Sequence, residues 1–152
     1  MKNPFQLFIS LLISVASFGQ PRNTPPAKTG KGSQIDTPTF TILPLSKAYV
    51  FDKTYTKATI TKSEIETINK LIRDKLKKVG YSNYQFEEYK KQFVAAIDKR
   101  GNKVVFVNAF CGTYDNWRTE FIDVLDGGTC VFQTTINLRS KKIISFSFNG
   151  EA

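Results

Sequence analysis

The sequence predicts an α+β domain in which one helix packs on an antiparallel sheet of about four to five strands. Three observations support this fold class. One helical stripe of apolar residues lies in the middle of the chain. Two segments follow it in which strand-like residues flank a turn, as in β-hairpins. Two cysteines stand where these hairpins meet a long connection. We expect the domain to span residues 39–152.

Two segments precede this domain. Residues 1–19 have the features of a secretory signal peptide: Lys2 supplies a positive start, an apolar run follows, and the small residues Ser17 and Gly19 precede a cleavage position. The run is shorter than the roughly 20 residues that a membrane span needs, and a retained anchor is the alternative. Residues 20–38 are rich in proline and glycine, which predicts a flexible linker. The mature protein is therefore expected to be secreted or periplasmic, with no transmembrane segment.

The first globular residues predict irregular strands. The segment 40–45 is apolar, but Pro44 restricts it to an edge strand. Residues 48–51 are a candidate short strand, and residues 56–60 are expected to lead into the helix.

The helix is predicted over residues 62–79. Thr61 and Glu64 have the spacing of a capping box, and Gly80 suits the left-handed position after the helix end. Apolar residues recur every three or four positions and form one stripe that faces a sheet; they are Ile65, Ile68, Ile72, Leu76 and Val79.

Two hairpins are predicted after the helix. Residues 90–97 and 103–110 flank a turn in which Gly101 can adopt a positive φ. Residues 131–138 and 142–148 flank a second turn at 139–141. In the last strand the alternation places Ile144, Phe146 and Phe148 on one face. Residues 117–125, in the connection between the hairpins, could form either a strand or a short helix.

The two cysteines, Cys111 and Cys130, are expected to form a disulfide, since cysteines of exported proteins usually pair. Two free buried thiols are the alternative. The chain contains no histidine, which excludes serine–histidine and cysteine–histidine catalytic sites and histidine-ligated zinc. We predict no metal and no cofactor, and we assign no catalytic residue.

One helix followed by an antiparallel meander resembles the cystatin-like fold, in which a curved sheet wraps a single helix. The resemblance covers residues 48–148 and rests on the order of the elements and on a cystine-containing connection between the middle strands. It implies the fold but not protease inhibition. The strand Gln92-Phe93-Val94-Ala95-Ala96 has Ala96 where the inhibitory motif has glycine, and the turn Arg139-Ser140-Lys141 lacks the proline and tryptophan of the second inhibitory hairpin.

Two groups in the disulfide loop, residues 111–130, are candidate functional residues. Tyr114, Trp117 and Arg118 could form a recognition patch, because tyrosine, tryptophan and arginine are enriched in binding hot spots; alternatively, Trp117 fills the edge of the core. Four carboxylates could hold calcium, serve a hydrolase or only solubilise the loop. They are Asp115, Glu120, Asp123 and Asp126.

The chain has a formal net charge of +9, with 22 basic and 13 acidic residues. Such a charge favours an acidic protein or an anionic polymer of the cell envelope as the partner, whereas nucleic acid is not expected. The sequence therefore predicts a secreted or periplasmic binding module that recognises a protein or polymer through the disulfide loop. A small hydrolase using loop carboxylates and a purely structural envelope protein are the alternatives.

Overall fold

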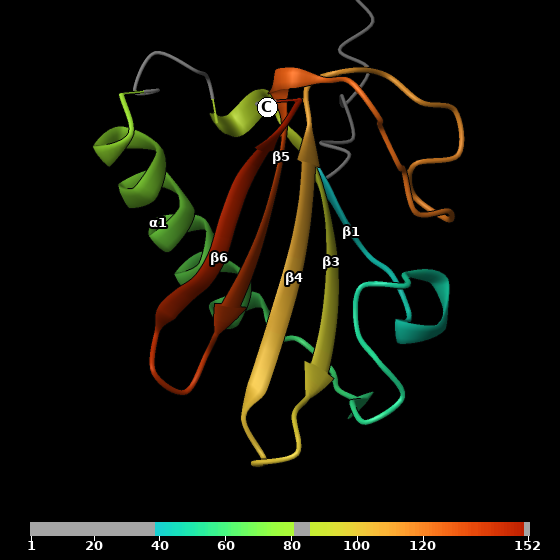
Figure 1. Cartoon of the computed structure of the whole chain (residues 1–152), viewed down its shortest axis with the longest axis vertical. Helices are drawn as coiled ribbons and strands as arrows, with labels where there is room; N and C mark the ends of the chain where they lie inside the picture. Colours follow the sequence, from blue (N-terminus) through green and yellow to red (C-terminus); the bar gives the residue numbers. More distant parts are fainter. Residues whose placement is uncertain (1–38, 81–85, 151–152) are drawn as a thin grey trace, which may run out of the picture. The chain divides into compact units, whose positions relative to one another are not determined.

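A computed structural model describes residues 39–80 and 86–150. The predicted signal peptide and linker lie outside the described residues and stay predictions. One α-helix and six strands make up the fold, together with two 3₁₀ turns, η1 (Leu45–Lys47) and η2 (Phe86–Glu88) (Figure 1). The helix is α1 (Lys62–Lys78), and the strands are β1 (Phe40–Ile42), β2 (Thr56–Lys57), β3 (Lys90–Ile97), β4 (Lys103–Phe110), β5 (Gly128–Asn137) and β6 (Lys142–Asn149). The predicted α+β class, with one helix on a sheet, is confirmed.

The sheet has the strand order β1-β3-β4-β5-β6, and β2 also pairs with β3. The pairs β3–β4, β4–β5 and β5–β6 are antiparallel, as expected for two hairpins joined by a connection. The prediction of an antiparallel sheet of about four to five strands is wrong in part. The sheet has six strands in the described residues, and it is mixed because β1 pairs parallel to β3. A parallel pair requires a crossover connection, and the segment that contains α1 supplies it.

The helix begins at the predicted residue, Lys62, and ends at Lys78, one residue before the predicted end. Thr61 and Glu64 form the capping box, and Gly80 has φ +84° just after the helix. The apolar stripe of α1 is buried against one face of the sheet. Its members are Ile65, Ile68, Ile72 and Leu76, and they pack in one cluster with Phe93, Val105, Val107, Phe132 and Ile136. Val79 lies past the last helical residue and remains 38% exposed.

A register shift between Thr135 and Ile136 changes the expected faces of β6. Ile143, rather than Ile144, pairs with Ile136 and packs against the helix-side core with Phe146 and Phe148. Ile144 is 60% exposed. Simple alternation therefore predicts Phe146 and Phe148 correctly and places Ile144 on the wrong face, because the irregularity offsets the strand.

The opposite face of the sheet, which we call the outer face, is covered over β3 and β4 by irregular chain. Leu43 and Ala48 pack with Val94 and Phe106 in one cluster. Trp117 and Ile122, from the disulfide loop, pack with Phe110 and Val131 in another. Both covering segments lack strand or helix where the sequence allowed it, since residues 48–51 and 117–125 adopt turns, bends and irregular chain. In the described part of the chain, no helix is both long and apolar enough to cross a membrane.

Candidate binding groove

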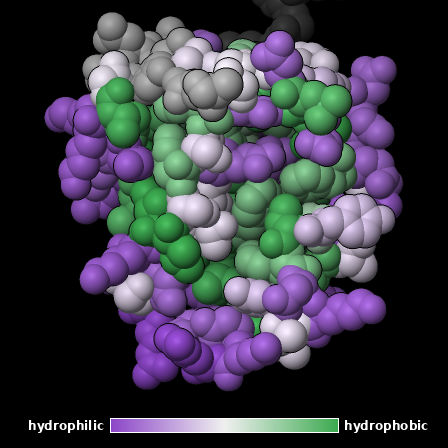
Figure 2. Space-filling model, viewed as in Figure 1, coloured by the Kyte–Doolittle hydropathy of each residue, from purple (hydrophilic) through white to green (hydrophobic). Residues whose placement is uncertain are grey.

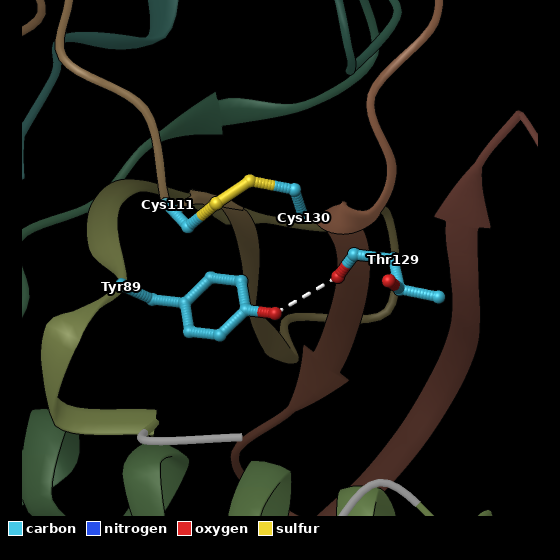
Figure 3. Close-up of a disulfide and its surroundings, with 4 residues drawn as sticks. All are labelled: Tyr89, Cys111, Thr129 and Cys130. Carbon is cyan, nitrogen blue, oxygen red and sulfur yellow. Dashed lines mark hydrogen bonds between the residues drawn. A yellow bond between two sulfur atoms is a disulfide. The ribbon is translucent and has the colours of Figure 1, made fainter.

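The disulfide predicted from the sequence is present and joins Cys111, just after β4, to Cys130 in β5. The two Cα atoms lie 5.3 Å apart, and the backbone N–H of Cys111 donates to the carbonyl of Cys130 at 3.0 Å. Figure 3 shows Tyr89 beside the disulfide, with its hydroxyl donating to the carbonyl of Thr129 at 2.8 Å. Tyr89 is itself buried, and its ring centroid lies 5.2 Å from that of Phe132. The base of the loop is therefore fixed to the core.

The aromatic residues of the loop serve mainly as packing residues. Trp117 is only 5% exposed and meets the ring of Phe110 edge-on, with 6.1 Å between centroids. The guanidinium of Arg118 covers the indole at 4.2 Å, and the ammonium of Lys90 lies 5.8 Å from it. Tyr114 packs edge-on against Phe110 at 5.2 Å. In this conformation Trp117 plugs the core, which was the alternative interpretation of this residue, and Arg118 is the exposed member of the predicted patch.

A row of amide side chains on the outer face holds the loop against the sheet. Gln92 of β3 pairs directly with Asn108 of β4, which pairs with Gln133 of β5. The amide of Gln92 donates to the carbonyls of Trp117 at 2.5 Å and Glu120 at 2.7 Å. Both Gln92 and Asn108 are buried.

Ile122 receives the remaining bonds of this row. The backbone N–H of Ile122 donates to the side-chain carbonyl of Gln92 at 3.0 Å. The backbone carbonyl of Ile122 accepts from the side-chain amide of Asn108 at 2.6 Å. Asn108 also donates to Gln92 at 3.2 Å. Since buried backbone groups need hydrogen-bond partners, these two side chains replace the ladder bonds that an irregular loop lacks.

Two further contacts fix the loop to the N-terminal part of the domain. The hydroxyl of Thr41 donates to the carbonyl of Arg118 at 3.0 Å. The ammonium of Lys47, in η1, lies 2.6 Å from a carboxylate oxygen of Glu120. This ion pair is half-exposed, so its net contribution to stability is small, and it spans the two segments.

Between these segments lies a groove with a volume of about 590 Å³. Its walls come from residues 46–50 and 120–123, and Gln133 of β5 contributes to its lining. Tyr49, on one wall, is 98% exposed although tyrosine has a large apolar ring. Glu120 and Asp123 supply carboxylates to the other wall, and Lys47 supplies a cation. We call this site the loop groove.

The four loop carboxylates do not gather at one point. Glu120 and Asp123 line the loop groove, whereas Asp115 and Asp126 do not. Among the described residues, no group of three or more acidic or cysteine side chains could hold a metal ion. The carboxylates of the loop groove exceed its cations by one, which suits a neutral or cationic ligand better than an anionic one.

Sequence reasoning found the loop but missed the other wall of the groove. Tyr49 lies in residues 48–51, which the sequence predicted as a short strand, and Ser46 and Lys47 lie just before it, where no element was predicted. Gln92 and Asn108 carry a detectable signal, because a turn centred on 98–102 sets them opposite each other in two strands whose neighbouring residues are mostly apolar. Two facing amides on a covered sheet face indicate that they bind backbone groups of the covering chain.

A buried lysine lies on the helix side of the sheet. Lys91 is 2% exposed, its ammonium donates to the carbonyl of Tyr89 at 2.8 Å, and it lies 4.3 Å from the centre of the Phe86 ring. Burial lowers the pKa of Lys91 to about 8; nearby Glu87 raises it and Arg73 lowers it further. The cation is thus less favourable here than in water.

Comparisons of this chain with protein-family models, with curated proteins and with solved structures find no significant match.

Proposed function

We propose that this protein is an exported binding module that recognises a protein partner through the loop groove. The observation that carries the proposal is the exposed ring of Tyr49 on the wall of a groove whose opposite wall is firmly held. Exposed tyrosines beside polar groups are typical binding residues, since they bury a large area and lose little side-chain entropy. The polar lining, with Ser46, Gln133 and two carboxylates, offers hydrogen bonds for orientation.

The rigidity of the disulfide loop supports this role. A loop that orders only when it binds loses conformational entropy, which weakens the complex. Here the disulfide, the amides of Gln92 and Asn108, and the contact from Thr41 hold the loop before any ligand arrives. The surplus of negative charge in the groove favours a partner segment that carries a lysine or arginine among polar residues.

The wider context of the proposal comes from the sequence. The signal-peptide pattern of residues 1–19 supports export, and a disulfide is expected in an oxidising compartment. A helix across a sheet with an antiparallel meander, β3 to β6, supports a cystatin-like architecture, while the parallel strand β1 is a departure from it. Fold alone does not define the ligand, so the groove carries the functional argument.

The test is a pull-down of envelope and culture-medium proteins of the source organism by the oxidised protein, eluted with increasing salt. The variants are Tyr49→Ala and Asp123→Asn, and Asp115→Asn is the matched control. Asp115 is an exposed carboxylate of the same loop that does not line the groove. We expect one stoichiometric partner that wild type and the control retain and that Tyr49→Ala loses by at least tenfold, as for a hot-spot residue.

Equal retention of that partner by Tyr49→Ala and the control would contradict the assignment of the groove. Equal loss of partner retention in Asp123→Asn and Asp115→Asn would show that the negative charge of the loop, and not the groove, determines binding. Each variant also needs an unchanged unfolding midpoint in urea, so that a loss of binding is not a loss of folding.

A further inference from the structure

The sheet end opposite the disulfide carries a concentration of positive charge. It contains the β3–β4 turn, the β5–β6 turn and the loop that precedes β2, and Figure 1 shows the two hairpin turns together at the lower end. The backbone N–H of Leu138 donates to the carbonyl of Lys103 at 3.0 Å and so joins the two turns. We call this surface the basic end. Its cations are Lys53, Lys57, Lys99, Arg100, Lys103, Arg139, Lys141 and Lys142.

Few acidic groups balance these eight cations. Lys103 pairs with Glu64 at 2.7 Å, and it is the only cation of the basic end with an ion pair among the described residues. Asp52 and Asp98 accept hydrogen bonds within their own turns, from Thr54 and from Asn102 and Arg100. The disulfide loop has the opposite balance, with four carboxylates and Arg118 as its one cation. The two ends of the sheet therefore differ in sign.

Two adjoining hollows give the basic end a shape as well as a charge. One has a volume of about 290 Å³ and is lined by Thr54, Tyr55, Lys99 and Arg100 with the two aspartates. The other has a volume of about 410 Å³ and shares Asp52 and Tyr55 with the first. It adds Lys53 and Lys57 together with Ser46 and the apolar residues Pro44, Leu45 and Phe51. The ring of Tyr55 thus borders both hollows, and it packs against Phe51 with 4.8 Å between centroids.

We propose that the basic end binds an anionic polysaccharide, such as a polymer of uronic acids, independently of the loop groove. Successive hollows suit successive sugar units, and the tyrosine ring between them offers a flat apolar face for a sugar ring to pack on. Hydroxyl groups in the hollows can donate hydrogen bonds to sugar hydroxyls and accept from them, whereas the carboxylates accept only. The surrounding lysines and arginines attract the acid groups of neighbouring units.

The same features distinguish a polysaccharide from an anionic lipid surface. A peripheral membrane site usually adds apolar anchors to its cations. Among the described residues, no exposed large hydrophobic side chain lies in the three turns, since the exposed ones are Ile42, Tyr49, Val79, Leu125 and Ile144. Figure 2 shows hydrophilic side chains covering the lower end of the molecule, where the hairpin turns lie. A polymer with hydroxyl groups fits this surface better than a membrane does.

The experiment measures binding of the oxidised protein to alginate, with neutral dextran and with vesicles of phosphatidylglycerol and phosphatidylcholine as comparisons, at low and physiological salt. The double variant Lys99→Gln, Arg100→Gln removes two charges at the hollows. The double variant Lys77→Gln, Lys78→Gln removes two exposed charges in the last turn of α1, outside the basic end, and serves as the matched control. We expect the first to weaken alginate binding about tenfold or more, by loss of two close charge contacts, and the control to weaken it less than threefold.

A third variant, Tyr55→Leu, leaves the charge unchanged. It should weaken alginate binding at least threefold while the affinity for vesicles stays the same. Equal losses in the two double variants would overturn the proposal, because the net charge alone would then account for binding. Binding to vesicles without binding to alginate would also overturn it. Partner retention at the loop groove should be the same in all three variants.

Discussion

The amide of Gln92 offers the sharpest test of how the disulfide loop is held. Replacing Gln92 with leucine keeps the size of the side chain and removes its two donors and its acceptor. The carbonyls of Trp117 and Glu120, the N–H of Ile122 and one amide N–H of Asn108 would each lose a partner in a largely buried site. A buried group left without its hydrogen bond costs about 1–3 kcal/mol.

Four such groups give an upper range of about 4–12 kcal/mol. The loop is at the surface and can shift to admit water, so we expect a value near the lower limit, about 4 kcal/mol. Domains of this size unfold with roughly 5–15 kcal/mol, which makes the loss a large fraction of the total. Urea unfolding followed by circular dichroism measures this loss of stability. The comparison is valid if the free energy of unfolding depends on urea concentration with the same slope in both proteins.

The matched control is Gln133→Leu, in the next position of the same row. Gln133 is half-exposed and makes one long contact, 3.5 Å to Asn108, so its replacement should cost less than about 1 kcal/mol. Trypsin provides a second measurement, because Arg118 lies in the loop. Cleavage there should speed up in Gln92→Leu but not in the control. Similar stabilities and similar cleavage rates for the two variants would refute the idea that Gln92 holds the loop.

Two further predictions concern the disulfide and the buried lysine. The double variant Cys111→Ser, Cys130→Ser opens a loop with a sequence separation of 19 and should lower the free energy of unfolding by about 3 kcal/mol in urea; a loss below about 1 kcal/mol would contradict the loop-entropy argument. For Lys91, the folded pKa of about 8 lies below the ordinary value of 10.5, so between these values the unfolded chain binds more protons and stability rises with pH. Lys91→Met should abolish this rise in the free energy of unfolding, measured in urea from about pH 7.5 to 10. Lys90→Met, at the neighbouring half-exposed lysine, should preserve it.

Local signals in the sequence predicted the parts of the fold that depend on local interactions. The capping residues Thr61 and Glu64, the apolar stripe of α1 and the glycine after it are all within one segment, and each was correct except that Val79, the last predicted member of the stripe, lies past the helix. The hairpin β3–β4 followed from a turn and its alternating strands. The disulfide followed from the expected compartment and the count of cysteines.

The remaining parts depend on contacts between distant segments. β1 is three residues long and becomes a strand only because β3, some fifty residues later, offers it a parallel edge. Residues 117–125 show neither the helical nor the strand period of apolar residues. Their path depends instead on side chains of β3 and β4 that bind their backbone. The residue type of Trp117 allows either a binding residue or a core residue. Its burial results from the packing of the disulfide loop on the sheet, which no local sequence pattern describes. The loop groove was missed for the same reason, since its two walls are separated by some seventy residues.

The way in which Gln92 and Asn108 hold the disulfide loop has a consequence for how this domain can change. Both side chains bind carbonyl and N–H groups, which every residue except proline provides. Exposed positions such as 119, 120 and 123 can therefore take other side chains while the loop keeps its path. The amide row therefore separates the framework from the side chains that line the loop groove, so substitutions can change the lining of the groove without changing the fold.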